Sequence, residues 1–343
     1  PALFSLAAFM GALLFTSIIL LIVGAQPGLT FQKMLQGAFG DNTKIANGLV
    51  VWAPLSLVSG ALIVTFKAGL WNLGVEGQIM VGAIFTTWVL RFFEPSSFNP
   101  QISIALACLG GVIGGMIWAA LTGILRLYGG VSEIFAGVGL NFVATALSLW
   151  LIFGPWKRPG VGSMSGTVPF KEELWLTMIP GYRLSVWSLI LVVVVFALLI
   201  VLLSRTRFGI QVKAIGKNPE AARLMGIRTK KTMMIAMLLC GGIAGLAGAI
   251  QVVGVYHRLI PSISSGYGFL GMLVAMLANN NFYVTLLVAY LFSILNIGGI
   301  QLPIDLQLDS TLSGVLQAAL VLFFLIMNGV KKKMMDKKES DGK

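Results

Sequence analysis

Long apolar runs separated by short polar or charged stretches dominate the sequence. The run 185–204 contains no charged residue in 20 positions. A helix of that length rises about 1.5 Å per residue and covers the roughly 30 Å hydrocarbon core of a bilayer. Ten such runs predict helices at about 2–24, 47–66, 77–90, 102–125, 134–153, 185–204, 233–255, 268–280, 283–300 and 311–330. We therefore expect an all-α integral membrane protein with about ten transmembrane helices.

One charge-free stretch is too long for a single crossing. Residues 259–304 contain no charged side chain over 46 positions, whereas about 20 residues suffice to span a bilayer. The chain must turn back within this stretch. The run Asn279-Asn280-Asn281 is the natural turn, because Asn tolerates the backbone conformations that tight turns need.

Two blocks of four predicted spans are related by inverted topology. We expect a single transmembrane domain over 1–343, with repeat one at about 47–153 and repeat two at about 232–330. An external loop (154–184), one span and a basic loop (205–231) separate the blocks, so the second block starts from the opposite side. Inverted repeats are common in transporters, whose pathway lies at the repeat interface.

Each block contains a glycine-rich interruption at the corresponding joint. The first covers 67–78 and the second covers 257–271. Irregular backbone at membrane depth is tolerated only where protein buries it or where it lines a cavity. These discontinuous or re-entrant helix breaks are therefore the predicted pathway segments.

Composition and charge define the environment. Hydrophobic residues make up 57% of the chain and charged residues 10%, against roughly 25% charged in soluble domains, which excludes a water-soluble enzyme. The formal net charge is +12. The segment 205–231 contributes +7 and the tail 331–343 contributes +3. Both flank apolar spans, so the positive-inside rule places them, and with ten spans both termini, in the cytoplasm. This distribution argues for a lipid bilayer as partner and against nucleic acid.

The chain has few residues that could carry out covalent chemistry or bind a metal. It has one histidine and no acidic cluster within a span, so we expect no metal and no cofactor bound by this chain. Gly216-Lys217 is followed by Asn218, where a P-loop needs Ser or Thr. Two other functions are disfavoured. A membrane-embedded enzyme such as a lipid-linked transferase would need clustered acidic residues to hold a metal and phosphate. A purely structural scaffold would not explain the two inverted helix breaks.

An ion-coupled secondary transporter of a small neutral solute remains the alternative function. It would need intramembrane proton or sodium relays, for which Glu76 is the main residue. Glu76 has two interpretations. It either has a structural role, favoured by the helix dipole at the start of an apolar helix or bonding freed backbone amides of the Gly74–Gly77 break, or it contacts the solute.

The basic loop contains a well-marked short helix. Asn218 is a good N-cap, Pro219 suits the first helical position and Glu220 complements the helix N-terminus. Ala221 and Ala222 continue the helix. Gly226 would end it. Such a helix either packs on the membrane surface or inserts into a partner's groove.

Three segments together carry a resemblance. The sequences at 69–78, 216–226 and 266–269 resemble permease subunits of ATP-binding-cassette (ABC) importers of the simple-sugar/nucleoside and branched-chain amino-acid type, most closely those for nucleosides. The resemblance implies a second permease subunit (homo- or heterodimer), a separate ABC ATPase that uses the ATP, and an extracytoplasmic solute-binding lipoprotein. It also implies the bacterial plasma membrane and a nucleoside or simple sugar as solute.

The same resemblance implies residue roles. The segment that would dock on the ATPase as a coupling helix contains Gly216, Asn218, Pro219, Glu220, Ala221, Ala222 and Gly226. The residues implied to lie on or near the translocation path are Asn72, Glu76, Tyr267 and Phe269.

Overall fold

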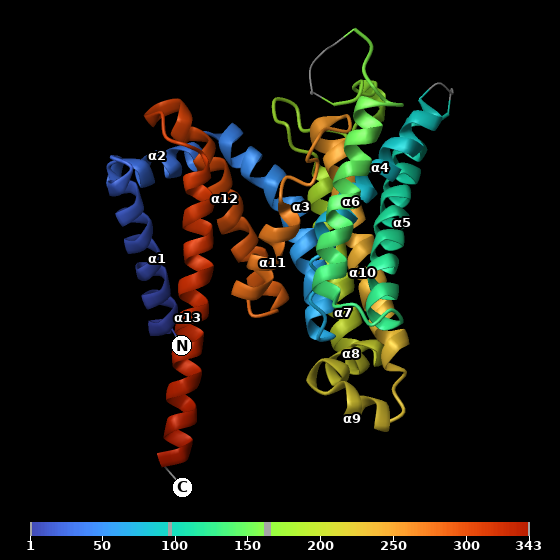
Figure 1. The fold of residues 1–343 in the computed structure, drawn as a ribbon. Coiled ribbons are helices and arrows are strands. Elements are labelled where there is room, and N and C mark those ends of the chain that lie inside the picture. The colour runs from blue at the N-terminus through green and yellow to red at the C-terminus, as the bar shows by residue number, and fades with distance from the viewer. Residues whose placement is uncertain (1, 95–97, 161–165, 342–343) are drawn as a thin grey trace.

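The computed structural model describes residues 2–94, 98–160 and 166–341, and helices make up most of this part of the chain (Figure 1). The α-helices are α1 (Ala2–Ile22), α2 (Pro27–Phe39), α3 (Asn42–Lys67), α4 (Val75–Phe93), α5 (Pro100–Leu127), α6 (Glu133–Phe153), α7 (Val186–Arg205), α8 (Arg207–Lys217), α9 (Pro219–Leu224), α10 (Thr229–Ile250), α11 (Tyr267–Leu277), α12 (Phe282–Leu306) and α13 (Thr311–Asp341). A 3₁₀ turn, η1 (Glu172–Leu174), and a π-helical extension of α10, η2 (Gln251–Tyr256), complete the fold.

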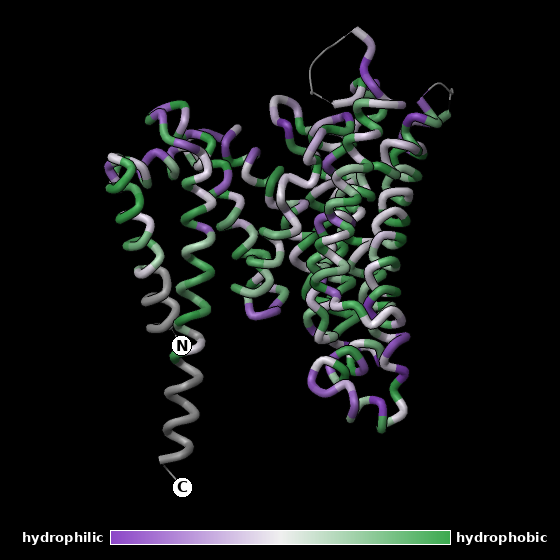
Figure 2. Tube along the Cα trace, viewed as in Figure 1, coloured by the Kyte–Doolittle hydropathy of each residue, from purple (hydrophilic) through white to green (hydrophobic). Residues whose placement is uncertain are grey.

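Every apolar run predicted from the sequence lies on a helix, and six of these helices are long and apolar enough to cross a membrane. They are α3, α5, α6, α7, α10 with η2, and α12. The pair α1 and α2 would make a seventh, but it bends by 110° at its joint. The prediction of an all-α membrane protein is therefore confirmed. Hydrophobic residues occupy the middle of the fold and hydrophilic residues its two ends (Figure 2).

The helices α4, α5 and α10 form a tightly packed group on one side of the fold. A Cβ atom on Gly115 of α5 would collide with the Gly241 carbonyl oxygen of α10, and one on Gly245 with the Gly111 carbonyl oxygen. Small residues allow such close approach of helix backbones in a membrane, where packing rather than water exclusion drives association. This group is the rigid base from which the two breaks project.

A second, separate core lies at the side of the molecule. Residues of α1, α2, α12 and α13 form it, including Leu20, Met34, Leu302 and Leu316. A salt bridge of 2.9 Å joins the Lys33 ammonium of α2 to the carboxylate of Asp305 on α12. Figure 1 shows α1 and α13 side by side, with α11 and α12 between them and the group made of α4, α5 and α10.

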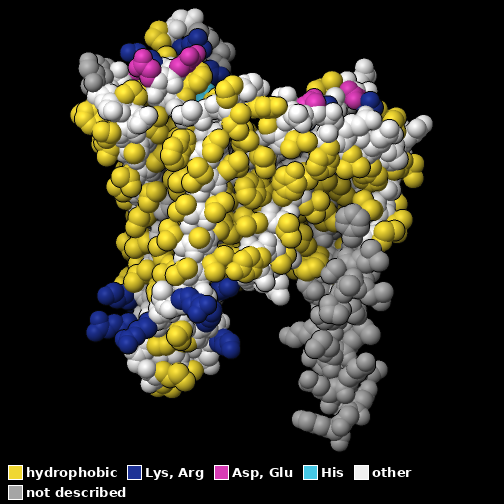
Figure 3. Space-filling view, turned by 180° about the vertical axis from the view of Figure 1, so that it is seen from behind, with side chains coloured by type: hydrophobic (Ala, Val, Ile, Leu, Met, Phe, Trp, Pro, Cys, Tyr) yellow, Lys and Arg dark blue, Asp and Glu magenta, His cyan; other side chains and the backbone are white. Residues whose placement is uncertain are grey.

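The two ends of the molecule differ in charge. Lysine and arginine gather at the end formed by α8 and α9, and the acidic side chains seen in Figure 3 lie at the opposite end. The basic loop predicted at 205–231 is the segment that contains both helices.

Two helices were not predicted. The amphipathic α2 was missed because its apolar residues are spaced among Gln, Lys and Gly and form no charge-free run. The structure also forms α8 within the basic loop, and its N-cap is the Thr206 hydroxyl, which accepts from the Gly209 N–H. In both cases one apolar face, rather than overall hydrophobicity, stabilises the helix.

Candidate functional site

The first break lies between α3 and α4 and is closed by side-chain amides. Gly69 reverses the chain with a φ of +73°. Asn72 is fully buried, and its amide exchanges two hydrogen bonds with the amide of Gln78, at 3.0 and 3.1 Å. The same Asn72 nitrogen lies 3.2 Å from the Cys240 sulfur on α10. The polar atoms of this break are thus satisfied within the protein, as burial at membrane depth requires.

A polar residue of α6 supports the same break. The Asn141 side chain accepts a 2.8 Å hydrogen bond from the Gly77 N–H and donates one of 2.8 Å to the Leu73 carbonyl. Sequence reasoning missed Asn141 and Gln78. The available signal was an amide in an otherwise apolar run, which in a bilayer needs a partner.

The second break lies between η2 and α11 and is held mainly by backbone hydrogen bonds. The backbone enters the left-handed region at His257, Ser262, Ser265 and Gly266. The segment 166–176, which we call the outer segment, lies along this break. Its Thr167 N–H donates to the Leu259 carbonyl at 2.9 Å, and its Phe170 N–H to the His257 carbonyl at 2.9 Å.

The outer segment also stacks an aromatic ring on the break. The rings of Trp175 and His257 are parallel, with centroids 3.8 Å apart. Burial and the nearby Arg183 together lower the pKa of His257 to about 4, so the imidazole is neutral at pH 7. The stack therefore joins two uncharged rings at the end of the molecule opposite α8 and α9.

The two breaks meet at Glu76. Its carboxylate lies in the first turn of α4 and accepts a 2.7 Å hydrogen bond from the Gly268 N–H in the first turn of α11. Gly268 is required there, because a Cβ atom would lie 2.8 Å from the Glu76 nitrogen and 2.9 Å from its Cα. Two helix N-termini, each with a partial positive charge, thus share one buried carboxylate.

The four predicted pathway residues occupy different environments. Asn72, Glu76 and Tyr267 are buried, with at most 8% of each exposed, whereas Phe269 is 50% exposed. Glu76 is brought against the first turn of α11, the turn that also holds Tyr267 and Phe269. Asn72 makes its contacts with Gln78 and Cys240 instead. Of these four residues, only Phe269 leaves a large part of its side chain exposed on the surface of this chain.

The short helix predicted in the basic loop is present as α9. The Asn218 side chain caps it by accepting from the Ala221 N–H at 3.1 Å, Pro219 is its first residue, and Gly226 turns the chain with a φ of +81°. Ala222 is buried, so its methyl group faces the protein. The exposed apolar tip consists of Leu224 and Met225, which are 86% and 79% exposed.

The base of α9 touches the first break. Gly216, near the end of α8, packs so closely on the end of α3 that a Cβ atom there would collide with the Lys67 carbonyl oxygen. Its Cα would also lie 3.4 Å from a Cβ atom on Gly69. Gly216 therefore places the end of α8 in direct contact with the backbone that leads to Asn72 and Glu76.

Family comparison decides the class of protein. The family model described as "Branched-chain amino acid transport system / permease component" matches residues 44–325. The chain belongs to this family. It is a multi-pass membrane permease subunit of an ABC importer, not an enzyme, and ATP hydrolysis takes place on a separate subunit.

Curated relatives agree over nearly the full length. The permease is 27% identical to the nucleoside ABC transporter permease protein NupB of Lactococcus lactis, over 94% of this chain and 90% of the relative. It is 29% identical to the glucose ABC transporter permease protein TsgB13 of Haloferax volcanii, over 89% and 81%. It is 26% identical to the guanosine ABC transporter permease protein NupP of Bacillus subtilis, over 92% and 93%.

Proposed function

We propose that this permease forms, together with a second permease subunit, the path for a nucleoside or a simple sugar across a bacterial plasma membrane. An extracytoplasmic binding lipoprotein would deliver the solute, and a separate ATPase would drive alternating access. The names of the relatives, which include nucleoside, guanosine and glucose permeases, support this range of solutes. The chain itself binds no cofactor in this proposal.

The observation that carries the proposal is the contact between the two breaks. Glu76 at the start of α4 accepts from Gly268 at the start of α11, and the two helices begin at breaks that belong to opposite halves of the sequence. Broken helices whose N-termini meet at a repeat interface are the usual architecture of a solute site in a transporter.

The direction of the helices supports two inverted repeats. α3 ends beside Gly216 of α8, so it runs toward the basic end. α10 begins just after α9, so it runs away from that end. The first helices of the two proposed repeats are thus antiparallel. Figure 1 shows α1 beginning, and α13 continuing, toward the same end as α8 and α9, which supports cytoplasmic termini.

In this mechanism α9 is the coupling helix. ATP-driven movement of the ATPase would displace the Leu224–Met225 tip, and Gly216 would pass the displacement to Gly69 and so to the Glu76–Gly268 contact. The solute would then meet the surface that Phe269 exposes, at the junction with the second permease.

The test is transport by proteoliposomes that contain the permease with its co-purifying subunits and binding protein. We expect uptake of one labelled nucleoside or sugar, from a panel of both, that requires ATP inside and survives a proton uncoupler. Uptake without ATP that collapses with the uncoupler would instead establish the ion-coupled secondary transporter.

A double variant tests the coupling helix itself. Leu224→Asp with Met225→Asp should abolish solute-stimulated ATP hydrolysis and leave the thermal unfolding temperature unchanged, because both side chains are exposed. Val131→Asp is the matched control: it changes another exposed apolar residue (39% exposed) in the loop between α5 and α6. Normal stimulation in the double variant would refute the role of α9.

A further inference from the structure

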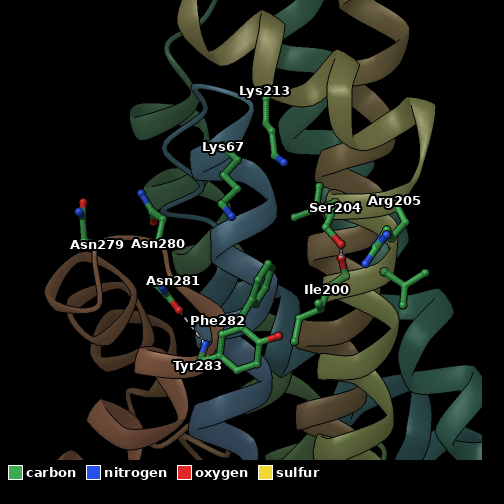
Figure 4. Close-up of a pocket in the computed structure, with 12 residues that line it drawn as sticks. Lys67, Ile200, Ser204, Arg205, Lys213, Asn279, Asn280, Asn281, Phe282 and Tyr283 are labelled. Carbon is green, nitrogen blue, oxygen red and sulfur yellow. Dashed lines mark hydrogen bonds between the residues drawn. The ribbon is translucent and has the colours of Figure 1, made fainter.

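An open cavity with a mainly apolar lining and three cationic side chains lies at the basic end of the molecule, away from the Glu76–Gly268 contact. Its volume is about 690 Å³. The end of α3 contributes Lys67, the end of α7 contributes Arg205, and α8 contributes Lys213 (Figure 4). The turn between α11 and α12 forms the facing wall. We call it the three-cation cavity.

The positive charges of this cavity have no acidic partner among the described residues. The two salt bridges among the described residues, Lys33–Asp305 and Arg126–Glu133, involve none of the three cationic side chains of the cavity. Lys67 and Lys213 both line the cavity, and Figure 4 shows both turned toward the same space, so their like charges repel each other. The Phe282 ring, 4.8 Å from the Lys67 ammonium, provides a favourable contact. Such an arrangement favours a bound anion that bridges the charges.

The opposite wall offers neutral polar groups. Asn279, Asn280 and Asn281 form the turn, and the Asn280 side-chain oxygen is buried without a hydrogen-bond partner among the described residues. An unpaired buried acceptor is costly unless a donor reaches it. The hydroxyl groups of a polar headgroup are donors of the required kind.

The remaining wall is apolar and continues toward the bilayer. Ile200 and Val201 of α7 line the cavity. Val201, Leu198 and Val194 are spaced by three and four positions, so they share one face of α7, and each is at least 45% exposed. Positive charges at the end of a membrane-spanning helix, above an apolar strip, fit a phosphate headgroup with its acyl chains along the strip.

We propose that the three-cation cavity binds the phosphate group of an anionic phospholipid, with Lys67 and Lys213 as the principal ligands. The occupant would bridge α8, which leads into α9, and the turn between α11 and α12. It would thereby remove the repulsion between the two lysines and hold together two elements that the proposed transport cycle moves. This site is independent of the identity of the transported solute.

Lipid retention measured by native mass spectrometry tests the site. The full chain, purified with its co-purifying subunits, is titrated with phosphatidylglycerol or with phosphatidylcholine of the same acyl chains. We expect preferential retention of phosphatidylglycerol. Lys67→Gln with Lys213→Gln should weaken that retention by about 25-fold, since each basic residue near an anionic headgroup contributes about a factor of five.

Two further variants keep the result interpretable. Lys67→Arg with Lys213→Arg preserves both charges and should restore retention, which separates charge from misfolding. Lys230→Gln with Lys231→Gln removes two charges at the same end, outside the cavity, and should retain phosphatidylglycerol as the unmodified chain does. Equal retention of the two lipids, or unchanged retention in the Lys67/Lys213 glutamine variant, would overturn the proposal.

A third arm identifies the source of the phosphate. Inorganic phosphate is added in place of lipid, and the thermal unfolding temperature is measured. The proposal predicts no stabilisation, because the apolar strip adds nothing to the binding of a free ion. Stabilisation that depends on Lys67 and Lys213, without retention of phosphatidylglycerol, would assign the cavity to free phosphate and contradict the lipid.

Discussion

The two breaks solve the same physical problem by different means. In the first, the side-chain amides of Asn72, Gln78 and Asn141 satisfy the buried polar groups. In the second, the backbone of the outer segment does most of this, at Thr167 and Phe170, together with the Thr167 hydroxyl, which accepts from the Leu259 N–H. We call the first arrangement the side-chain clamp, and it depends only on residues inside this chain. We call the second the backbone clamp, and a protein that binds the outer segment could alter it.

This difference matches the ends of the molecule that the breaks approach. The first break is in contact with Gly216 at the base of α9, where the ATPase would act. The second break is covered by the outer segment at the opposite end, where a binding protein would act. In the proposed mechanism each break would respond to a different partner, and Glu76 joins the two breaks.

The largest effect is expected where the breaks touch. Gly268→Val places a branched side chain against the Glu76 backbone, so α11 must move away from α4. Overpacking of this kind costs about 1–3 kcal/mol of stability, and we expect ATP-driven uptake to be lost. The measurement is uptake into proteoliposomes, normalised to correctly inserted protein.

Gly139→Val provides the matched control, because nothing lies within 4 Å of a Cβ atom at Gly139 of α6. It should transport normally. Full transport by the Gly268→Val variant would mean that the close approach of α4 and α11 has no part in function.

An intermediate effect is expected from the side-chain clamp. Asn72→Leu leaves the Gln78 amide buried without its partner and should lower the free energy of unfolding by about 1–2 kcal/mol. The double variant Asn72→Leu with Gln78→Leu removes both amides and should be less destabilised than the sum of the single variants. Thermal unfolding of all four proteins in detergent gives the coupling energy. Strict additivity would show that the two amides do not depend on each other.

The smallest effect is expected from the backbone clamp. Trp175→Ala removes the ring stacked on His257 and should cost about 1 kcal/mol, because the backbone hydrogen bonds of Thr167 and Phe170 remain. The His257 pKa of about 4 lies below its ordinary value of 6.5. The unfolded chain therefore binds the proton more readily.

The pH dependence follows from that sign. The contribution of neutral His257 to stability is complete above about pH 6.5 and declines as the pH falls toward 4. Thermal unfolding between pH 7.5 and 5 measures it, and His257→Phe, which keeps an uncharged ring, should remove this part of the slope. An identical slope in that variant would show that His257 is not the titrating group.

Local signals explain what the sequence predicted well. Asn218 and Pro219 define the start of α9 by capping alone, and Asn279–Asn281 forms a turn for reasons confined to three residues. The apolar runs predict helices because a bilayer stabilises long, hydrophobic helices. None of these features requires knowledge of a distant residue.

Long-range contacts explain what the sequence did not predict. The Glu76 carboxylate bonds to a backbone amide 192 positions away, and a carboxylate at a helix start has no local feature that indicates such a partner. The sequence left a structural and a solute-contacting interpretation of Glu76 open, and the Gly268 contact adds a defined structural partner. The burial of Ala222 and the exposure of Leu224 likewise depend on how α9 rests on the protein.

The most direct test of the account is the distance between the two breaks during the ATPase cycle. Spin labels replace Trp71 and Phe269, one from each break, which are 46% and 50% exposed. Their separation is measured by double electron–electron resonance in the assembled transporter, with ADP and with ATP trapped by vanadate. The account predicts that the distance distribution shifts between the two states, and that it does not shift in the Leu224→Asp, Met225→Asp variant. An unchanged distribution in the spin-labelled transporter that keeps Leu224 and Met225, while it hydrolyses ATP and moves solute, would contradict the proposed coupling.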